Sequence, residues 1–172
     1  MKTLFKTTAV AAALAFAPAA MAQDMGWYGD VGVAQVSVDV GGGDLDFTTI
    51  QGRVGYDFND YFGAEGELGF GVAGESGGGA SIDLSYNVGA YGVISTANTE
   101  GFEFFGRLGF AKAELDGNAG SISGSGSDDG LAYGAGIKYL FDGVNGIRAD
   151  YTRYDFDLVE ADVISVAYAR KF

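Results

Sequence analysis

The chain has 172 residues with 30 glycines, 13 phenylalanines and 10 tyrosines, and it contains neither cysteine nor histidine. Their absence excludes a disulfide scaffold, a thiol nucleophile and histidine-dependent acid–base or metal chemistry, so we expect no catalytic residue, no metal site and no cofactor. A net charge of −13 argues against nucleic-acid binding, because phosphates require a basic surface.

Residues 1–22 have the features of a cleaved secretory signal peptide. Lys2 and Lys6 precede an apolar run over residues 9–17, and Ala20-Met21-Ala22 supplies the small-x-small cleavage pattern before Gln23. The run is too short for a transmembrane helix, which takes about 20 apolar residues. We therefore predict an exported protein whose mature part, residues 23–172, is one domain.

Apolar and polar residues alternate with a period of two along the mature chain. In residues 47–58, Ile50, Val54 and Phe58 share one parity, and Gln51 and Arg53 share the other. This period is typical of strands and not of helices. Further runs with the same alternation cover residues 27–38, 61–72, 81–94, 102–114, 131–141, 147–154 and 162–172. The sequence thus predicts eight strands.

The connections between these runs alternate in length. Short connections are expected at 59–60, 95–101 and 142–146. Longer ones, rich in glycine, serine and aspartate, are expected at 39–46, 73–80, 115–130 and 155–161. Short turns at one end and long loops at the other are typical of an outer-membrane barrel.

The apolar face of the runs is wide and aromatic, and the opposite face carries charges and small residues. An eight-stranded barrel has a narrow interior, which large side chains from every strand would overfill. We therefore predict an all-β protein: an eight-stranded antiparallel transmembrane up-and-down β-barrel, apolar outside and polar inside. An aromatic girdle is expected beside the short turns at Tyr56, Phe58, Tyr61, Phe62, Tyr139 and Phe141. The alternative is a soluble secreted ligand-binding barrel that buries these aromatics.

The inward parity predicts a lumenal charge cluster. Its members are Arg53, Glu65, Glu67, Arg107, Lys138 and Asp150. Arg53 should face Glu65 and Glu67 across the hairpin at residues 59–60, with Arg107 at a similar height. Lys138 should pair with Asp150 across the turn at residues 142–146. Such a cluster is either a structural salt-bridge network that fills the lumen or the gate of a narrow passive pore.

The long connections are acidic. They contain Asp39, Asp44, Asp46, Glu75, Glu114, Asp116, Asp128, Asp129, Asp155, Asp157, Glu160 and Asp162. This charge either serves solubility or binds divalent cations that bridge to lipopolysaccharide phosphates.

The chain finishes on Phe172, whose parity is shared by Ile164, Val166 and Tyr168. This ending resembles the terminal β-signal of outer-membrane proteins, which the barrel-assembly machinery reads, although Arg170 occupies a position that is usually apolar. The whole mature chain resembles the small eight-stranded outer-membrane β-barrels of proteobacteria, the group of OmpA-like transmembrane domains and short porin-family proteins.

The resemblance implies a location in the bacterial outer membrane, contact with its lipid and lipopolysaccharide, and an assembly signal at Ile164, Val166, Tyr168 and Phe172. It also implies a non-catalytic structural or surface-interaction role, since outer-membrane barrels with enzymatic activity use a catalytic histidine, which this chain lacks. We expect a monomer.

Overall fold

The computed structural model describes residues 26–39, 44–73, 76–77, 80–119, 122–156 and 160–172. The expected signal peptide at residues 1–22 and its cleavage site before Gln23 lie outside the described residues. Within the described part of the chain, no helix is long and apolar enough to cross a bilayer.

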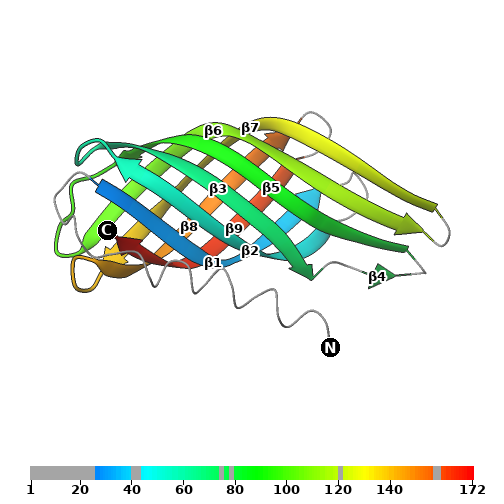
Figure 1. Ribbon diagram of the computed structural model, residues 1–172, viewed down its shortest axis with the longest axis horizontal. Helices are drawn as coiled ribbons and strands as arrows, with labels where there is room; N and C mark the ends of the chain where they lie inside the picture. Colours follow the sequence, from blue (N-terminus) through cyan, green and yellow to red (C-terminus); the bar gives the residue numbers. More distant parts are fainter. Residues whose placement is uncertain (1–25, 40–43, 74–75, 78–79, 120–121, 157–159) are drawn as a thin grey trace.

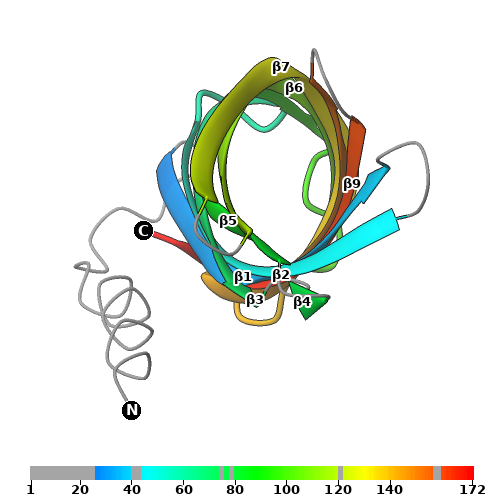
Figure 2. The same ribbon diagram turned by 90° about the vertical axis from the view of Figure 1, so that its right-hand side faces the viewer.

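Eight long antiparallel strands close into a barrel (Figures 1 and 2). They are β1 (Gly26–Asp39), β2 (Asp44–Asp57), β3 (Phe62–Ala73), β5 (Ala80–Ser95), β6 (Phe102–Ala119), β7 (Ile122–Leu140), β8 (Asn145–Phe156) and β9 (Glu160–Lys171). A two-residue piece, β4 (Ser76–Gly77), pairs with β5. Each strand pairs with its sequence neighbour, β9 pairs with β1, and β3 pairs with β5. The predicted fold class is confirmed.

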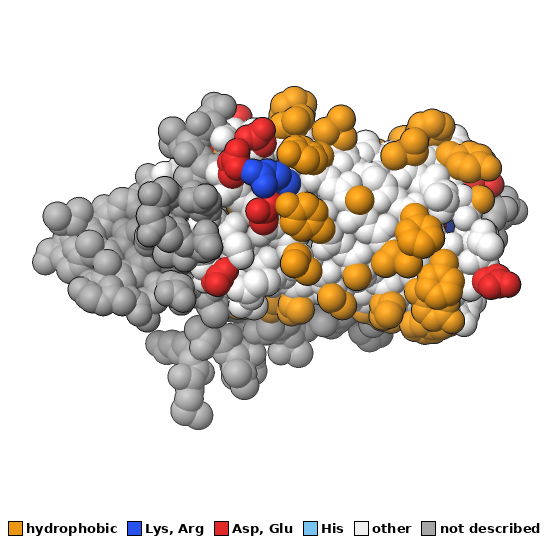
Figure 3. Space-filling model, turned by 180° about the vertical axis from the view of Figure 1, so that it is seen from behind, with side chains coloured by type: hydrophobic (Ala, Val, Ile, Leu, Met, Phe, Trp, Pro, Cys, Tyr) orange, Lys and Arg blue, Asp and Glu red, His pale blue; other side chains and the backbone are white. Residues whose placement is uncertain are grey.

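Successive side chains point alternately into the barrel and away from it. Arg53 is 1% exposed and Leu108 is 58% exposed, as the alternation predicts. Figure 3 shows one side of the barrel, where hydrophobic side chains lie between charged side chains near the two ends of the molecule. On β3 the outward residues from Phe62 to Val72 span roughly 25 Å along the barrel axis, for a rise of about 3.3 Å and a tilt of about 40°. This height matches the hydrocarbon core, and the alternative of a soluble barrel is wrong.

Aromatic side chains gather at the end that carries the short turns. The rings of Trp27 and Tyr56 lie 5.2 Å apart, and those of Phe102 and Tyr139 stack at 4.5 Å. Phe58 and Phe141 are exposed beside the same turns. The described chain also begins and ends here, since the N–H of Phe172 donates to the carbonyl of Trp27 at 2.9 Å. These positions form the predicted aromatic girdle.

One predicted loop is a strand pair. The expectation of a long loop over residues 115–130 is wrong, because β6 and β7 stay paired from Phe102–Tyr139 to Ala119–Ile122. Figure 1 shows this hairpin extending past β8, which pairs with β7 only from Gly130 onward, while β5 stays paired with β6 up to Ala119. A backbone ladder satisfies every N–H and C=O without needing apolar side chains, so a glycine- and serine-rich segment can continue it.

Candidate functional site

Charged side chains from five strands meet inside the barrel. They are Asp30 of β1, Arg53 of β2, Glu65 and Glu67 of β3, Arg107 of β6, and Arg148 and Asp150 of β8. We call these seven residues the ion-pair plug. Each of these side chains is at most 1% exposed. These side chains are therefore shielded from solvent in the folded barrel.

Arg53 joins the two sides of the plug. Its Nε lies 3.0 Å from Glu67 Oε2, and its Nη1 lies 2.8 Å from Asp150 Oδ1. Nη2 donates to Ser165 Oγ at 2.8 Å. Arg53 and Glu67 are direct cross-strand neighbours, so the predicted pairing across the β2–β3 hairpin is confirmed for Glu67. Glu65 lies opposite Gly55 in the same register and pairs with other arginines.

Arg107 lies at the same height, as predicted. Its Nη1 contacts Glu65 Oε1 at 2.9 Å and Glu67 Oε2 at 2.7 Å. Its Nε and Nη2 donate to Thr152 Oγ1 at 3.0 and 2.8 Å. Every donor-bearing nitrogen of this guanidinium therefore has an acceptor, which buried charge requires.

Arg148 is the third arginine of the plug. The predicted cluster did not include it. Its Nη1 contacts Asp30 Oδ2 at 3.0 Å, its Nε contacts Asp150 Oδ1 at 2.9 Å, and it also pairs with Glu65. Three guanidinium groups thus face four carboxylates, which leaves the plug with a formal charge of −1. Arg148 and Asp30 share the inward parity of their strands, and that parity is the signal that would have found them.

Lys138 does not pair with Asp150, and this prediction is wrong. Lys138 lies opposite Arg148 in the β7–β8 register, whereas Asp150 lies opposite Gly136. The turn is centred on Gly143, whose φ of 77° permits a tight reversal. The expected pairing assumed a centre one residue later. Lys138 Nζ contacts Glu103 Oε1 at 3.0 Å instead, nearer the turn end, and Lys171 Nζ lies 3.6 Å from Glu103 Oε2.

Aromatic rings also fill the lumen, although small residues were expected beside the charges. Tyr154 and Tyr91 donate their hydroxyls to Glu67 Oε1 at 2.6 and 3.2 Å. The Tyr91 ring also lies 4.2 Å from the Arg107 guanidinium. Flat rings can stack on guanidinium groups while a hydroxyl reaches a carboxylate, so they fit a space that branched apolar side chains would overfill.

Two further rings extend this arrangement toward the turn end. Tyr28 donates to Glu65 Oε2 at 3.0 Å, and its ring lies 4.1 Å from Lys138 Nζ. The Arg148 guanidinium lies 4.2 Å from the ring of Phe105. Gly55 makes room for Tyr28, since a Cβ at that position would collide with the Tyr28 ring. Phe105 lies between Glu103 and Arg107 in sequence and shares their inward parity, which the prediction of small residues overlooked.

Three of the four predicted assembly-signal residues lie on the outer face of β9, and the fourth, Phe172, follows the last residue of that strand. Ile164, Val166 and Tyr168 are exposed there, and β9 pairs with β8 on one side and β1 on the other.

Within the described residues, no group of three or more acidic, histidine or cysteine side chains converges to hold a metal ion. The lumenal side chains described above form ion pairs and hydrogen bonds that connect the strands.

Residues 7–172 match the family model described as "Outer membrane protein beta-barrel domain". The chain belongs to this family. An outer-membrane barrel has its short turns in the periplasm and its long loops outside the cell, so the plug lies within the membrane-spanning part of the lumen. The protein is thus a barrel of the Gram-negative outer membrane.

Solved structures of outer-membrane proteins share the fold of this barrel. Ail of Yersinia pestis, in complex with the heparin analogue sucrose octasulfate, is 23% identical with a TM-score of 0.70, over 87% of this chain and 100% of that chain. Neisserial surface protein A is 15% identical with a TM-score of 0.68, over 85% and 97%. The N-terminal barrel domain of Pseudomonas aeruginosa OprF is 14% identical with a TM-score of 0.62, over 86% and 99%. Comparison with curated protein sequences gives no match.

The loop end of this outer-membrane barrel is acidic. The structure describes the side chains of Asp46, Glu114, Asp128, Asp129, Asp155, Glu160 and Asp162 there. Arg153 pairs with Glu160 and, at 3.4 Å, with Asp162. The side chains of Asp39, Asp44, Glu75, Asp116 and Asp157 lie outside the described part. We call the seven described acids the outer rim.

Proposed function

We propose that this protein is a non-conducting, non-catalytic barrel of the outer membrane that serves envelope structure and surface interaction. The observation that carries this proposal is the ion-pair plug. Its side chains are at most 1% exposed, and they join β1, β2, β3, β6 and β8 across the lumen. A conducting pore needs a hydrated path, and this buried ion-pair network leaves none at this level.

The outer rim favours neutral or cationic surface partners. The Ail structure holds a heparin analogue, which is a polyanion. The outer rim here has seven acidic side chains, with Arg153 already paired to two of them. Such a field repels sulfated ligands. The likeness to Ail therefore supports a surface role for this protein, but with a partner that is neutral or cationic instead of a polyanion.

The remaining partners follow from the proposed location. Lipid and lipopolysaccharide surround the hydrophobic band, and the barrel-assembly machinery would read Ile164, Val166, Tyr168 and Phe172 during insertion. A monomer is supported by the closed sheet, because the eight long strands are all paired on both sides. A non-catalytic role is supported by the lack of histidine and cysteine in the chain.

Bilayer recordings separate a structural plug from a gate. We expect the refolded wild-type protein in planar bilayers to give no current steps beyond those of protein-free liposomes. Arg53→Ala should leave the conductance unchanged while lowering stability, and Arg153→Ala at the outer rim serves as the matched control. Regular wild-type channels whose conductance rises in Arg53→Ala would instead establish a gated pore and contradict the proposal.

A further inference from the structure

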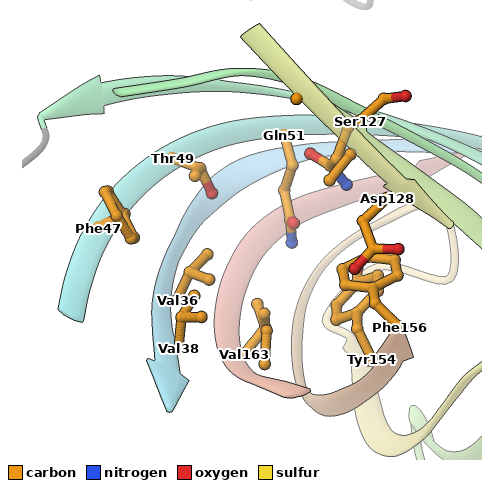
Figure 4. Close-up of a pocket in the computed structure, with 14 residues that line it drawn as sticks. Val36, Val38, Phe47, Thr49, Gln51, Ser127, Asp128, Tyr154, Phe156 and Val163 are labelled. Carbon is orange, nitrogen blue, oxygen red and sulfur yellow. The ribbon is translucent and has the colours of Figure 1, made fainter. Parts of the chain in front are cut away.

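A cavity of about 190 Å³ lies on the loop side of the ion-pair plug, and the plug does not use it. Its apolar walls come from β1, β2, β8 and β9 (Figure 4). They include Val36, Val38, Phe47, Phe156, Ala161 and Val163. We call this cavity the outer pocket. An engineered apolar cavity of about 150 Å³ binds benzene, so the outer pocket has room for one ring with a small substituent.

Tyr154 and Gln51 line the outer pocket where it approaches the plug. Tyr154 donates its hydroxyl to Glu67 at 2.6 Å, and Asn87 donates its amide to the same residue at 3.2 Å. Thr49 donates to the carbonyl of Ala34 at 3.5 Å. Three of the polar groups that line the pocket are therefore engaged within the protein.

Gln51 is different. Its side chain reaches from β2 toward the middle of the outer pocket (Figure 4). The residue is 3% exposed, and Nε2 has no hydrogen-bond partner among the described residues. Buried donors are rarely left without an acceptor, because the loss of hydration is costly. Among the described residues that line the outer pocket, Gln51 therefore presents the one buried donor without a partner.

The charge around the outer pocket disfavours an anion. Among the described residues that line it, Asp128 is the one charged side chain and none is basic. The outer rim adds further acids at the same end. A carboxylate ligand would lose its hydration without gaining a cation, whereas an uncharged oxygen acceptor meets no such penalty.

We propose that the outer pocket binds one small uncharged molecule, an aromatic ring or short branched chain bearing a carbonyl oxygen that accepts a hydrogen bond from Gln51 Nε2. This site is independent of whether the barrel conducts. The ligand class follows from the apolar walls, the volume and the buried, unpaired donor of Gln51.

Methyl NMR of the valine-labelled protein in lipid nanodiscs tests the proposal with acetophenone as ligand. Val36 and Val163 should show saturable shifts. Val33 and Val54 face the lipid and should show only the linear shifts of partitioning. Isopropylbenzene, which has a similar shape and no oxygen, should bind roughly tenfold more weakly. Benzoate should give no saturable shift.

Variants give the complementary result. Gln51→Leu should weaken acetophenone to the level of isopropylbenzene, while leaving isopropylbenzene unchanged. Val163→Phe should abolish the saturable shifts of Val36, and Val33→Phe on the lipid side should not. The spectrum of the methyls remote from the pocket checks that each variant is folded. Absence of saturable shifts in the wild type, or equal affinity for the two ligands there, would overturn the proposal.

Discussion

Arg53 on β2 donates to Asp150 on β8 at 2.8 Å, although 97 residues separate them in the sequence. These strands are not neighbours in the sheet, because β2 pairs with β1 and β3 while β8 pairs with β7 and β9. The bond therefore crosses the lumen. It can form only when the barrel has closed, and it joins opposite walls of the finished fold.

We expect Arg53→Ala to lower the free energy of unfolding by about 3–5 kcal/mol, because it leaves Glu67 and Asp150 buried with one cation fewer. Urea unfolding in phospholipid vesicles measures the change. The control is Arg153→Ala at the outer rim, whose partners Glu160 and Asp162 are exposed. The Arg153→Ala variant should lower the free energy of unfolding by less than about 1 kcal/mol. Equal losses in the two variants would show that the plug does not stabilise the barrel.

Gly55→Ala should destabilise the barrel by about 1–3 kcal/mol, since its Cβ would collide with the Tyr28 ring inside the lumen. Gly52→Ala on the same strand is the matched control. A Cβ there meets its nearest atom, the Asp30 carbonyl oxygen, at an ordinary 3.8 Å. It should leave stability within about 0.5 kcal/mol of the wild type. The same unfolding assay compares them, and a tolerated Gly55→Ala would argue against the packing of Tyr28.

The β7–β8 turn should be sensitive to pH through Asp142. The backbone N–H of Asn145, the Asn145 side-chain amide and the N–H of Val144 donate to this carboxylate and hold the pKa of Asp142 below its ordinary value. A lowered folded-state pKa stabilises the protein above the unfolded pKa, about 3.9, and this contribution is lost as the pH falls through the folded pKa.

The stability difference between wild type and Asp142→Ala should therefore be full at pH 7 and shrink below about pH 4. Unfolding titrations from pH 7 to pH 3 measure it. Asp60→Ala, in the exposed turn between β2 and β3, is the control for general charge effects. A difference that grows on acidification would contradict the role of the Asp142 carboxylate.

Deleting Phe172 should impair assembly of the protein in the outer membrane of cells without lowering the stability of the folded barrel. Its backbone N–H contacts Trp27 at 2.9 Å near the end of the barrel, so its loss removes little folded-state structure. We expect less protein in the outer membrane of cells but unchanged refolding into vesicles. Membrane fractionation and heat-modifiable migration on gels report the two effects. Normal insertion in cells would refute the proposed assembly signal.

The parity of the sequence predicted the barrel because every outward position on β3 from Phe62 to Val72 is apolar or glycine, while Glu65 and Glu67 share the opposite parity. It also predicted Arg53 beside Glu67, because a hairpin with a short turn fixes the register between its strands. The same reasoning failed for Lys138 and Asp150, where an error of one residue in the turn centre shifts the cross-strand partner by two.

The sequence pattern could not predict which side chains meet across the lumen. Asp30 and Arg148 are 118 residues apart, and their meeting depends on how the strands are staggered around the closed barrel. Tyr91 shares the inward parity of Asn87, whereas the inward ring of Phe105 was missed because small residues were expected beside Glu103 and Arg107. Their flat stacking on Arg107 and Arg148 is a property of the assembled interior.

Oxygen accessibility of nitroxide labels along β6 tests whether apolar side chains face lipid while charged ones lie inside. The chain has no native cysteine, so each single-cysteine variant carries one label. The outward sites are Phe104, Leu108 and Phe110, and the inward sites are Phe105, Ala111 and Ala113. In bilayers, collision with dissolved oxygen should be high at the outward sites and low at the inward ones. Higher accessibility at the inward sites, or a profile without period two, would contradict a lipid-facing apolar surface around an ion-paired lumen.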